Sequence, residues 1–154
     1  LLRERGAAVQ VIHLTGRNDE AWVREAYEKA GVSHRVYGFL KEMGCAYRAA
    51  DLAIARSGAA SCAELAICGV PACLVPFPFA QGNHQLANAR IMAVAGAADL
   101  MEQKDLTAAG LADYIAACIR EPERLDTMRR AMKDMAVPDA AARLADLVES
   151  VGAA

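Results

Sequence analysis

Residues 56–64 read Arg56-Ser-Gly-Ala-Ala-Ser-Cys-Ala-Glu64, and this run of small side chains follows directly on the apolar segment Leu52–Ala55. An apolar strand, a tight turn of small residues and a helix are typical of one unit of a parallel sheet. The first N–H groups of a helix have no partner within the helix and carry partial positive charge. We therefore expect an anion site where this helix begins.

A second polar cluster follows the next apolar segment. After Ala72–Phe77 the chain reads Gln81-Gly-Asn-His-Gln85. In open parallel sheets ligands bind outside the carboxyl ends of the strands, which is where both clusters are expected. Glu64, one helical turn beyond the small-residue loop, is well placed to accept hydrogen bonds from sugar hydroxyls. Together these features predict a pocket for a nucleotide sugar.

The composition indicates an ordinary globular protein. The chain has 154 residues, of which 55% are hydrophobic and 23% charged, so we expect one domain over residues 1–154 with a real core. The net charge of −2 and the aromatic content of 5% argue against nucleic-acid binding. No apolar run approaches the roughly 20 residues that span a bilayer.

The five cysteines are odd in number and lack the spacing of metal ligands. We therefore expect reduced, mostly buried thiols and neither a disulfide framework nor a metal site. Packing in the core is the preferred interpretation of Cys62. The cysteines are Cys45, Cys62, Cys68, Cys73 and Cys118.

Strand and helix patterns alternate along the chain, which predicts a parallel sheet covered by helices on both faces. The expected strands are Val9–Leu14, Arg35–Tyr37, Leu52–Ala55, Ala72–Val75 and Ala98–Met101. The expected helices are Glu20–Ala30, Lys41–Ala49, Ala60–Cys68, His84–Val94, Thr107–Ile119, Pro122–Met135 and Asp139–Val151. The stripe of Leu125, Met128, Met132 and Met135 is expected to face the core. Leu1–Gly6 is typical of a helix end capped by glycine, and an α/β domain that starts this way is expected to lack its first strand–helix unit.

Several of these segments, in this order, resemble the bacterial MurG family. The matching segments are His13-Leu-Thr-Gly16, Phe39-Leu-Lys-Glu-Met43, Arg56–Glu64, Gly69-Val-Pro71, Val75-Pro-Phe77, Asn83-His-Gln85 with Asn88, Gly96-Ala-Ala98 and Val137-Pro-Asp139. The resemblance implies a glycosyltransferase that moves N-acetylglucosamine from UDP-N-acetylglucosamine to lipid I and so forms lipid II for peptidoglycan. It also implies the GT-B fold, with this chain as the Rossmann-like carboxy-terminal domain that binds the donor. The lipid I site and the contact with the cytoplasmic face of the inner membrane would belong to a missing amino-terminal domain, and no cofactor is implied.

The same resemblance implies roles for individual residues. Backbone groups of Leu40 would meet the uracil edge, with Met43 packed nearby. Glu64 would hold the ribose hydroxyls, and Gln85 with His84 would reach the N-acetylglucosamine, although some family members have Gln in place of His84. The diphosphate would lie on the loop and first turn made by Ala59, Ala60, Ser61, Cys62 and Ala63, chiefly on the N–H groups of the first three.

Each of these residues also has a purely structural interpretation. The loop at residues 56–64 could be a turn that needs small side chains for packing, and Glu64 could be a solvated acid that stabilises its own helix. Arg56 could contact phosphate, or it could pair with a nearby acid and hold the loop. Gln85 and Asn88 could cap the helix that begins near Asn83; we favour binding for Gln85, and capping or packing for Asn88.

The expected mechanism needs no metal, because no Asp-x-Asp motif is present and the helix start would stabilise the departing diphosphate. Ser57 is not a candidate nucleophile, since the Gly-x-Ser-x-Gly elbow is absent. His13 and His34 receive structural interpretations, as a strand-end histidine and a surface histidine. The resemblance implies inversion at the anomeric carbon, with the general base on the other domain and an isolated chain that is inactive. The alternatives are another GT-B transferase that uses a UDP-sugar, or a separate donor-binding subunit that needs a membrane partner.

Overall fold

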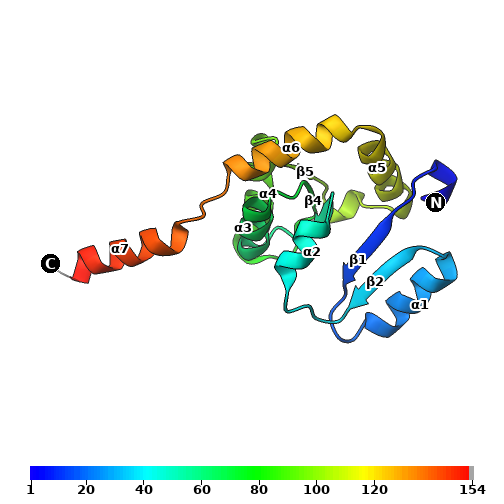
Figure 1. Cartoon of the computed structure of the whole chain (residues 1–154), viewed down its shortest axis with the longest axis horizontal. Coiled ribbons are helices and arrows are strands. Elements are labelled where there is room, and N and C mark those ends of the chain that lie inside the picture. Colours follow the sequence, from blue (N-terminus) through cyan, green and yellow to red (C-terminus); the bar gives the residue numbers. More distant parts are fainter. Residues whose placement is uncertain (153–154) are drawn as a thin grey trace. The chain divides into compact units, whose positions relative to one another are not determined.

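The computed structural model describes residues 1–152, except for the side chain of Arg3. Over these residues strands alternate with helices along the chain, and the strands pair parallel within each of two sheets (Figure 1). The chain divides into two compact units, residues 1–50 with 104–124 and residues 51–103 with 125 onward. The strands are β1 (Gln10–Leu14), β2 (Ser33–Tyr37), β3 (Ala53–Ala55), β4 (Ala72–Leu74) and β5 (Ala98–Leu100). The helices are α1 (Glu20–Ala30), α2 (Met43–Ala49), α3 (Ala59–Cys68), α4 (His84–Val94), α5 (Ala108–Arg120), α6 (Pro122–Asp134) and α7 (Ala140–Gly152), with 3-10 turns η1 (Arg3–Arg5), η2 (Gln81–Asn83) and η3 (Gln103–Asp105).

The first unit contains a two-stranded parallel sheet in which Gln10 pairs with Ser33 and Leu14 with Tyr37. Helix α1 follows β1 and lies along this ribbon (Figure 1). Val23 of α1 and Val36 of β2 are buried between them. The glycine-capped start expected at Leu1–Gly6 is a single 3-10 turn, η1, which Gly6 ends in the left-handed conformation.

Tyr27 of α1 contacts both histidines of the two-stranded sheet. Its hydroxyl lies 3.1 Å from Nδ1 of His13, and its ring stacks on His34 with centroids 5.3 Å apart. These contacts agree with structural roles for the two histidines, but His34 is half-buried by the stacking and is not the surface histidine that the sequence indicated. Burial also raises the pKa of Tyr27.

The second unit contains a three-stranded parallel sheet in the order β3-β4-β5. The central strand β4 is Ala72-Cys73-Leu74, and all three side chains are fully buried. A continuous apolar strand is expected wherever a parallel strand is covered on both faces. The pairing of Ala55 with Leu74 aligns the carboxyl ends of β3 and β4, so the loops that follow them open at one edge.

Helix α6 contributes the expected methionine stripe to the core of the second unit. Met128 and Met132 are buried, while Leu125 and Met135 are half-buried. The aliphatic part of Lys133, on the same helix, lies against Gly69, which ends α3 in the left-handed conformation with φ of 64°. The sulfur-containing stripe is therefore core, as its helical spacing predicts.

Candidate functional site

The site begins at the first turn of α3, in the second unit. Gly58 precedes the helix in an extended conformation and its carbonyl accepts the first helical hydrogen bond, from the Cys62 N–H at 2.9 Å. Gly58 has no side chain with which to cap the helix. Helix geometry leaves the N–H groups of Ala59, Ala60 and Ser61 without partners inside the helix. Ala59 and Ala60 are exposed and Ser61 is half-buried, and N–H donors at a helix start are suited to bind an anion.

The first turn of α4 lies on the same unit, and α3 and α4 are neighbours (Figure 1). Its cap residue, Asn83, adopts a left-handed conformation with φ of 53° and forms no side-chain capping bond. Nδ1 of His84 lies 2.7 Å from the carbonyl oxygen of Gln81. A carbonyl can only accept, so Nδ1 carries the hydrogen and, in the neutral ring, Nε2 is the acceptor. His84 is exposed, so this acceptor faces the surface at the start of α4.

Gln85 does not cap its helix; its side chain reaches back to the loop after β4. The Phe77 N–H donates to Oε1 of Gln85 at 2.9 Å. This bond fixes the orientation of the amide, because only the oxygen end can accept it. The Nε2 group, with its two N–H donors, is therefore the part of Gln85 that can serve a ligand.

Ser57 and Asn88 join the two helix starts. The Ser57 hydroxyl donates to the Gln85 carbonyl at 2.8 Å, and Nδ2 of Asn88 donates to the Ser57 carbonyl at 3.0 Å. Ser57 is fully buried and its hydroxyl is used in the bond to a main-chain carbonyl, so it lacks the exposure that a nucleophile needs. Asn88 packs and does not cap, which settles the alternative that the sequence left open.

Arg56 holds the loop after β4. Its Nη1 donates to the carbonyl oxygens of Val75 and Pro76, both at 3.1 Å, and its Nη2 donates to Oε1 of Gln103 at 2.8 Å. The guanidinium also lies 5.5 Å from the centre of the Phe77 ring. Of the two roles that the sequence allowed, the structure supports the loop-holding one, with backbone carbonyls and an amide as partners in place of an acid.

The remaining residues of the small-residue helix start differ in exposure. Ala63 and Glu64 are exposed, while Ser61 and Cys62 are half-buried. Burial raises the pKa of the Cys62 thiol, so at neutral pH it is less ionised than an ordinary cysteine, which agrees with a packing role. Glu64 lies one turn into α3, as the sequence indicated.

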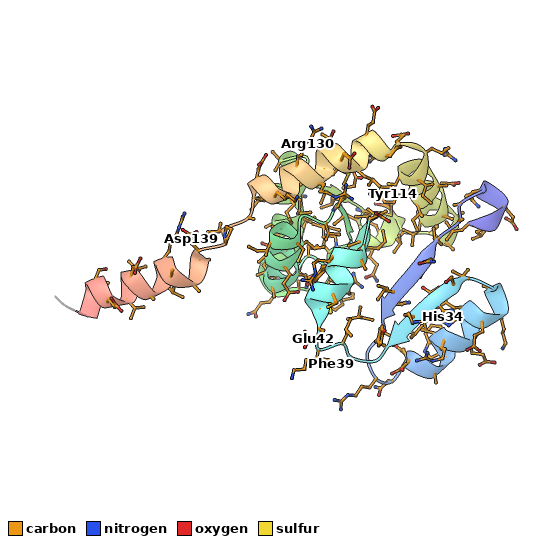
Figure 2. All side chains as sticks on the ribbon, in the orientation of Figure 1. His34, Phe39, Glu42, Tyr114, Arg130 and Asp139 are labelled. Atoms are coloured by element: carbon orange, nitrogen blue, oxygen red, sulfur yellow. The ribbon has the colours of Figure 1, made fainter. Side chains whose placement is uncertain are left out.

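Leu40 and Met43 belong to the first unit. Leu40 lies in the loop between β2 and α2, and Met43 is the first residue of α2; both are half-buried. Figure 2 shows their neighbours Phe39 and Glu42 on this same stretch of chain, and Phe39 is 71% exposed. The role of Leu40 and Met43 toward uracil stays a prediction.

Two features of the site are not among the predictions from the sequence: the hydrogen bonds that connect Ser57 with Gln85 and Asn88, and an exposed pair of aromatic side chains. Phe77 and Phe79 meet edge-to-face with ring centroids 5.7 Å apart, and Phe79 is 83% exposed. The Phe-Pro-Phe spacing gave a signal for this pair, because two aromatic residues after the end of a buried strand have no core left to enter.

The model of the glycosyltransferase family 28 C-terminal domain matches residues 1–144. The chain belongs to this family. The resemblance to MurG that the motifs indicated is thereby confirmed, as are the parallel sheets flanked by helices. The two helix starts described above follow the carboxyl ends of β3 and β4, the edge at which open parallel sheets generally bind ligands.

Relatives of this family 28 domain share its sequence over nearly all of its length. The chain is 46% identical over 142 residues to a protein from Thiobacillus denitrificans and 44% identical over 155 residues to one from Nitratidesulfovibrio vulgaris. Both carry the name UDP-N-acetylglucosamine--N-acetylmuramyl-(pentapeptide) pyrophosphoryl-undecaprenol N-acetylglucosamine transferase. The matches cover 92% and 96% of this chain but only 38% and 41% of those relatives. The chain thus spans about two fifths of the length of the proteins it matches.

Solved structures of glycosyltransferases share the fold of this domain. Acinetobacter baumannii MurG superposes on 92% of this family 28 domain with a TM-score of 0.79 and 29% identity, using 43% of its own chain. A glycotransferase of kitacinnamycin, at 22% identity and a TM-score of 0.63, shares the fold. Among the described residues, no helix of the domain has both the length and the apolar character of a membrane span.

Proposed function

We propose that this chain is the donor-binding domain of an inverting glycosyltransferase, which transfers N-acetylglucosamine from UDP-N-acetylglucosamine to lipid I and so forms lipid II. The names of relatives that are 44–46% identical support this substrate pair. The observation that carries the proposal is the first turn of α3, where Gly58 offers no side-chain cap and helix geometry leaves the N–H groups of Ala59, Ala60 and Ser61 without partners inside the helix. Such donors suit a diphosphate.

In this proposal each part of the donor has its own partner. The amides of Ala59–Ser61 bind the diphosphate and stabilise the charge that develops on it as the glycosidic bond breaks. Glu64 accepts hydrogen bonds from the ribose hydroxyls, and Leu40 with Met43 contacts the uracil. Nε2 of Gln85 donates to a sugar hydroxyl, and Nε2 of His84 accepts from another. Helix α3 continues through Cys62 and Ala63, which complete the turn below the diphosphate.

The attacking group is the 4-hydroxyl of the muramoyl sugar of lipid I, and the general base that takes its proton lies outside this chain. The acceptor and the membrane surface on which the enzyme works, the cytoplasmic face of the inner membrane, are likewise contacted outside it. We therefore expect residues 1–154 alone to bind UDP-N-acetylglucosamine weakly and to transfer no sugar.

Binding tests the proposal directly. UDP-N-acetylglucosamine is titrated calorimetrically into the wild-type chain, Glu64→Ala and Glu149→Ala, which removes another exposed helical acid, on α7. Loss of hydrogen bonds to a charged group costs about 1.5–3 kcal/mol, which is roughly one to two decades of affinity for Glu64→Ala. The Glu149→Ala variant keeps the wild-type affinity. Equal affinities for wild type and Glu64→Ala would remove Glu64 from the pocket.

Transfer is tested in a chimera, because the chain spans 38% of the Thiobacillus denitrificans relative. This chain replaces the matching segment of that protein, and transfer to lipid I is measured with UDP-N-acetylglucosamine and with UDP-glucose. We expect transfer of N-acetylglucosamine in preference to glucose, and a strong loss of it with Glu64→Ala. A chimera that folds and binds donor but prefers UDP-glucose would refute the proposed sugar.

A further inference from the structure

Two backbone segments that are far apart in the sequence are tied together beside the first turn of α4. The Ser57 hydroxyl donates to the Gln85 carbonyl at 2.8 Å, and the Asn88 side chain donates to the Ser57 carbonyl at 3.0 Å. The two bonds run in opposite directions across the same gap, so the segment before α3 is fixed to the first turn of α4. Ser57 is fully buried, and in such surroundings hydrogen bonds are well shielded from water.

Gln85 is held a second time through its side chain. The Phe77 N–H donates to Oε1 of Gln85 at 2.9 Å, and Arg56 fixes the preceding residues of that loop by bonding the carbonyls of Val75 and Pro76. The position of the Gln85 amide therefore depends on contacts at both its main chain and its side chain. A ligand that contacts Nε2 of Gln85 meets a group whose place is set by Ser57 and Asn88.

Ser57 and Asn88 hold the first turn of α4 in position. The Ser57 hydroxyl is not needed to satisfy an otherwise orphaned carbonyl at Gln85, because that carbonyl also accepts within helix α4 by helix geometry. Ser57 is too deeply buried to touch a ligand at the surface. What the pair does determine is where the start of α4 stands relative to the start of α3.

Resting on the proposed function, we propose that Ser57 and Asn88 are positioning residues that set the affinity for the sugar part of the nucleotide sugar. The diphosphate contacts the start of α3, whereas the sugar contacts Gln85 at the start of α4. Loosening the connection lets the first turn of α4 move while leaving the first turn of α3 intact. The connection thus governs the preference for UDP-N-acetylglucosamine over UDP.

The test compares the dissociation constants of UDP and UDP-N-acetylglucosamine for the full chain and two variants. Ser57→Ala deletes the hydroxyl, and Asn88→Asp keeps the shape of the side chain but replaces its donor with an acceptor. We expect both variants to bind UDP-N-acetylglucosamine about five- to tenfold more weakly and UDP within about twofold of wild type. Thr107→Ala is the matched control: it removes the Thr107 cap of α5, whose Oγ1 accepts from the Gly110 N–H at 3.0 Å, and should alter stability without altering the ratio of the two constants.

A second readout needs no ligand. In both variants the amide of Phe77 should exchange its hydrogen faster than in wild type, because its acceptor on Gln85 is no longer held, and NMR measures this rate residue by residue. The inference is overturned if the ratio of the two dissociation constants stays at the wild-type value, whether both constants are unchanged or both rise together. A wild-type chain that binds neither UDP nor UDP-N-acetylglucosamine refutes the proposed function, and this inference falls with it.

Discussion

Replacing Gln85 by glutamate separates the two ends of its side chain. The oxygen end accepts from the Phe77 N–H at 2.9 Å, and a carboxylate accepts that bond at least as well, because charged acceptors form stronger hydrogen bonds. The nitrogen end, proposed to donate to a sugar hydroxyl, becomes an oxygen that cannot donate. Gln85→Glu is therefore expected to keep the fold of the loop and to lose the sugar contact.

The expected magnitude follows from the bonds involved. A neutral hydrogen bond contributes about 0.5–1.5 kcal/mol, which corresponds to an affinity about two- to twelvefold lower for UDP-N-acetylglucosamine. The new negative charge adds repulsion toward the diphosphate of a few tenths to about 1 kcal/mol at an exposed site. Gln85→Leu removes the acceptor as well, so it should also lower the free energy of unfolding, by about 1 kcal/mol.

Calorimetry with UDP and UDP-N-acetylglucosamine, together with thermal unfolding, measures both effects. Gln81→Glu is the matched control, since it places the same charge on the exposed turn η2, four residues earlier, and reports the repulsion alone. The preference for UDP-N-acetylglucosamine over UDP should fall for Gln85→Glu and persist for Gln81→Glu. If Gln85→Glu retains the wild-type preference, Nε2 does not donate to the sugar and the reasoning is wrong.

Two further predictions concern stability and reactivity. Gly69 has φ of 64° and an added Cβ would lie 2.6 Å from Cε of Lys133, whereas Gly96 has φ of 71° in open space. In chemical denaturation both alanine variants should lose about 1–2 kcal/mol of unfolding free energy to left-handed strain, and Gly69→Ala should lose more because of the contact with Lys133. Equal losses would mean that Lys133 moves aside at no cost. Burial raises the pKa of Cys62, while Cys45 is exposed. Iodoacetamide at pH 7.5 should therefore alkylate Cys45 first, and the alkylation rate of Cys62 should increase when the pH is raised past 9, as followed by peptide mass mapping. Equal rates for the two cysteines at pH 7.5 would contradict the burial argument.

The helices were predictable from the sequence because their signals are local. Glu20–Ala30 ends at Gly31 in the left-handed conformation, and His84–Val94 starts after a polar turn, so both predicted ranges agree with the structure. Helix α2 was expected from Lys41 but begins at Met43. Strand boundaries depend on the partner strand. The predicted second strand begins at Arg35, yet Ser33 also pairs with Gln10, because the register with β1 outweighs the low strand preference of polar residues.

The chemistry of the site was only partly predictable, for a related reason. Residue type and order indicate that Gly58 precedes a helix with accessible amides, and this needs no knowledge of distant residues. Which partner Arg56 selects depends on the approach of a loop some 20 residues further along the chain. Likewise, the orientation of the Gln85 amide follows from its contact with Phe77, and no single-sequence pattern encodes which end of an amide is occupied.

The use of Arg56 to hold a loop has a consequence for how this domain would bind a diphosphate. Its guanidinium is engaged by three oxygens, on Val75, Pro76 and Gln103, so a phosphate could recruit it only by breaking bonds that position the loop next to Gln85. The attraction for phosphate must then come mainly from the amides and dipole of α3, which are fixed in the backbone and need no reorganisation when charge develops. Small residues at 58–61 would suit such a diphosphate site, because any bulky side chain there would stand between the amides and the ligand. Binding through amides predicts weak dependence on side-chain identity at Ala59 and Ala60 but strong dependence on side-chain size.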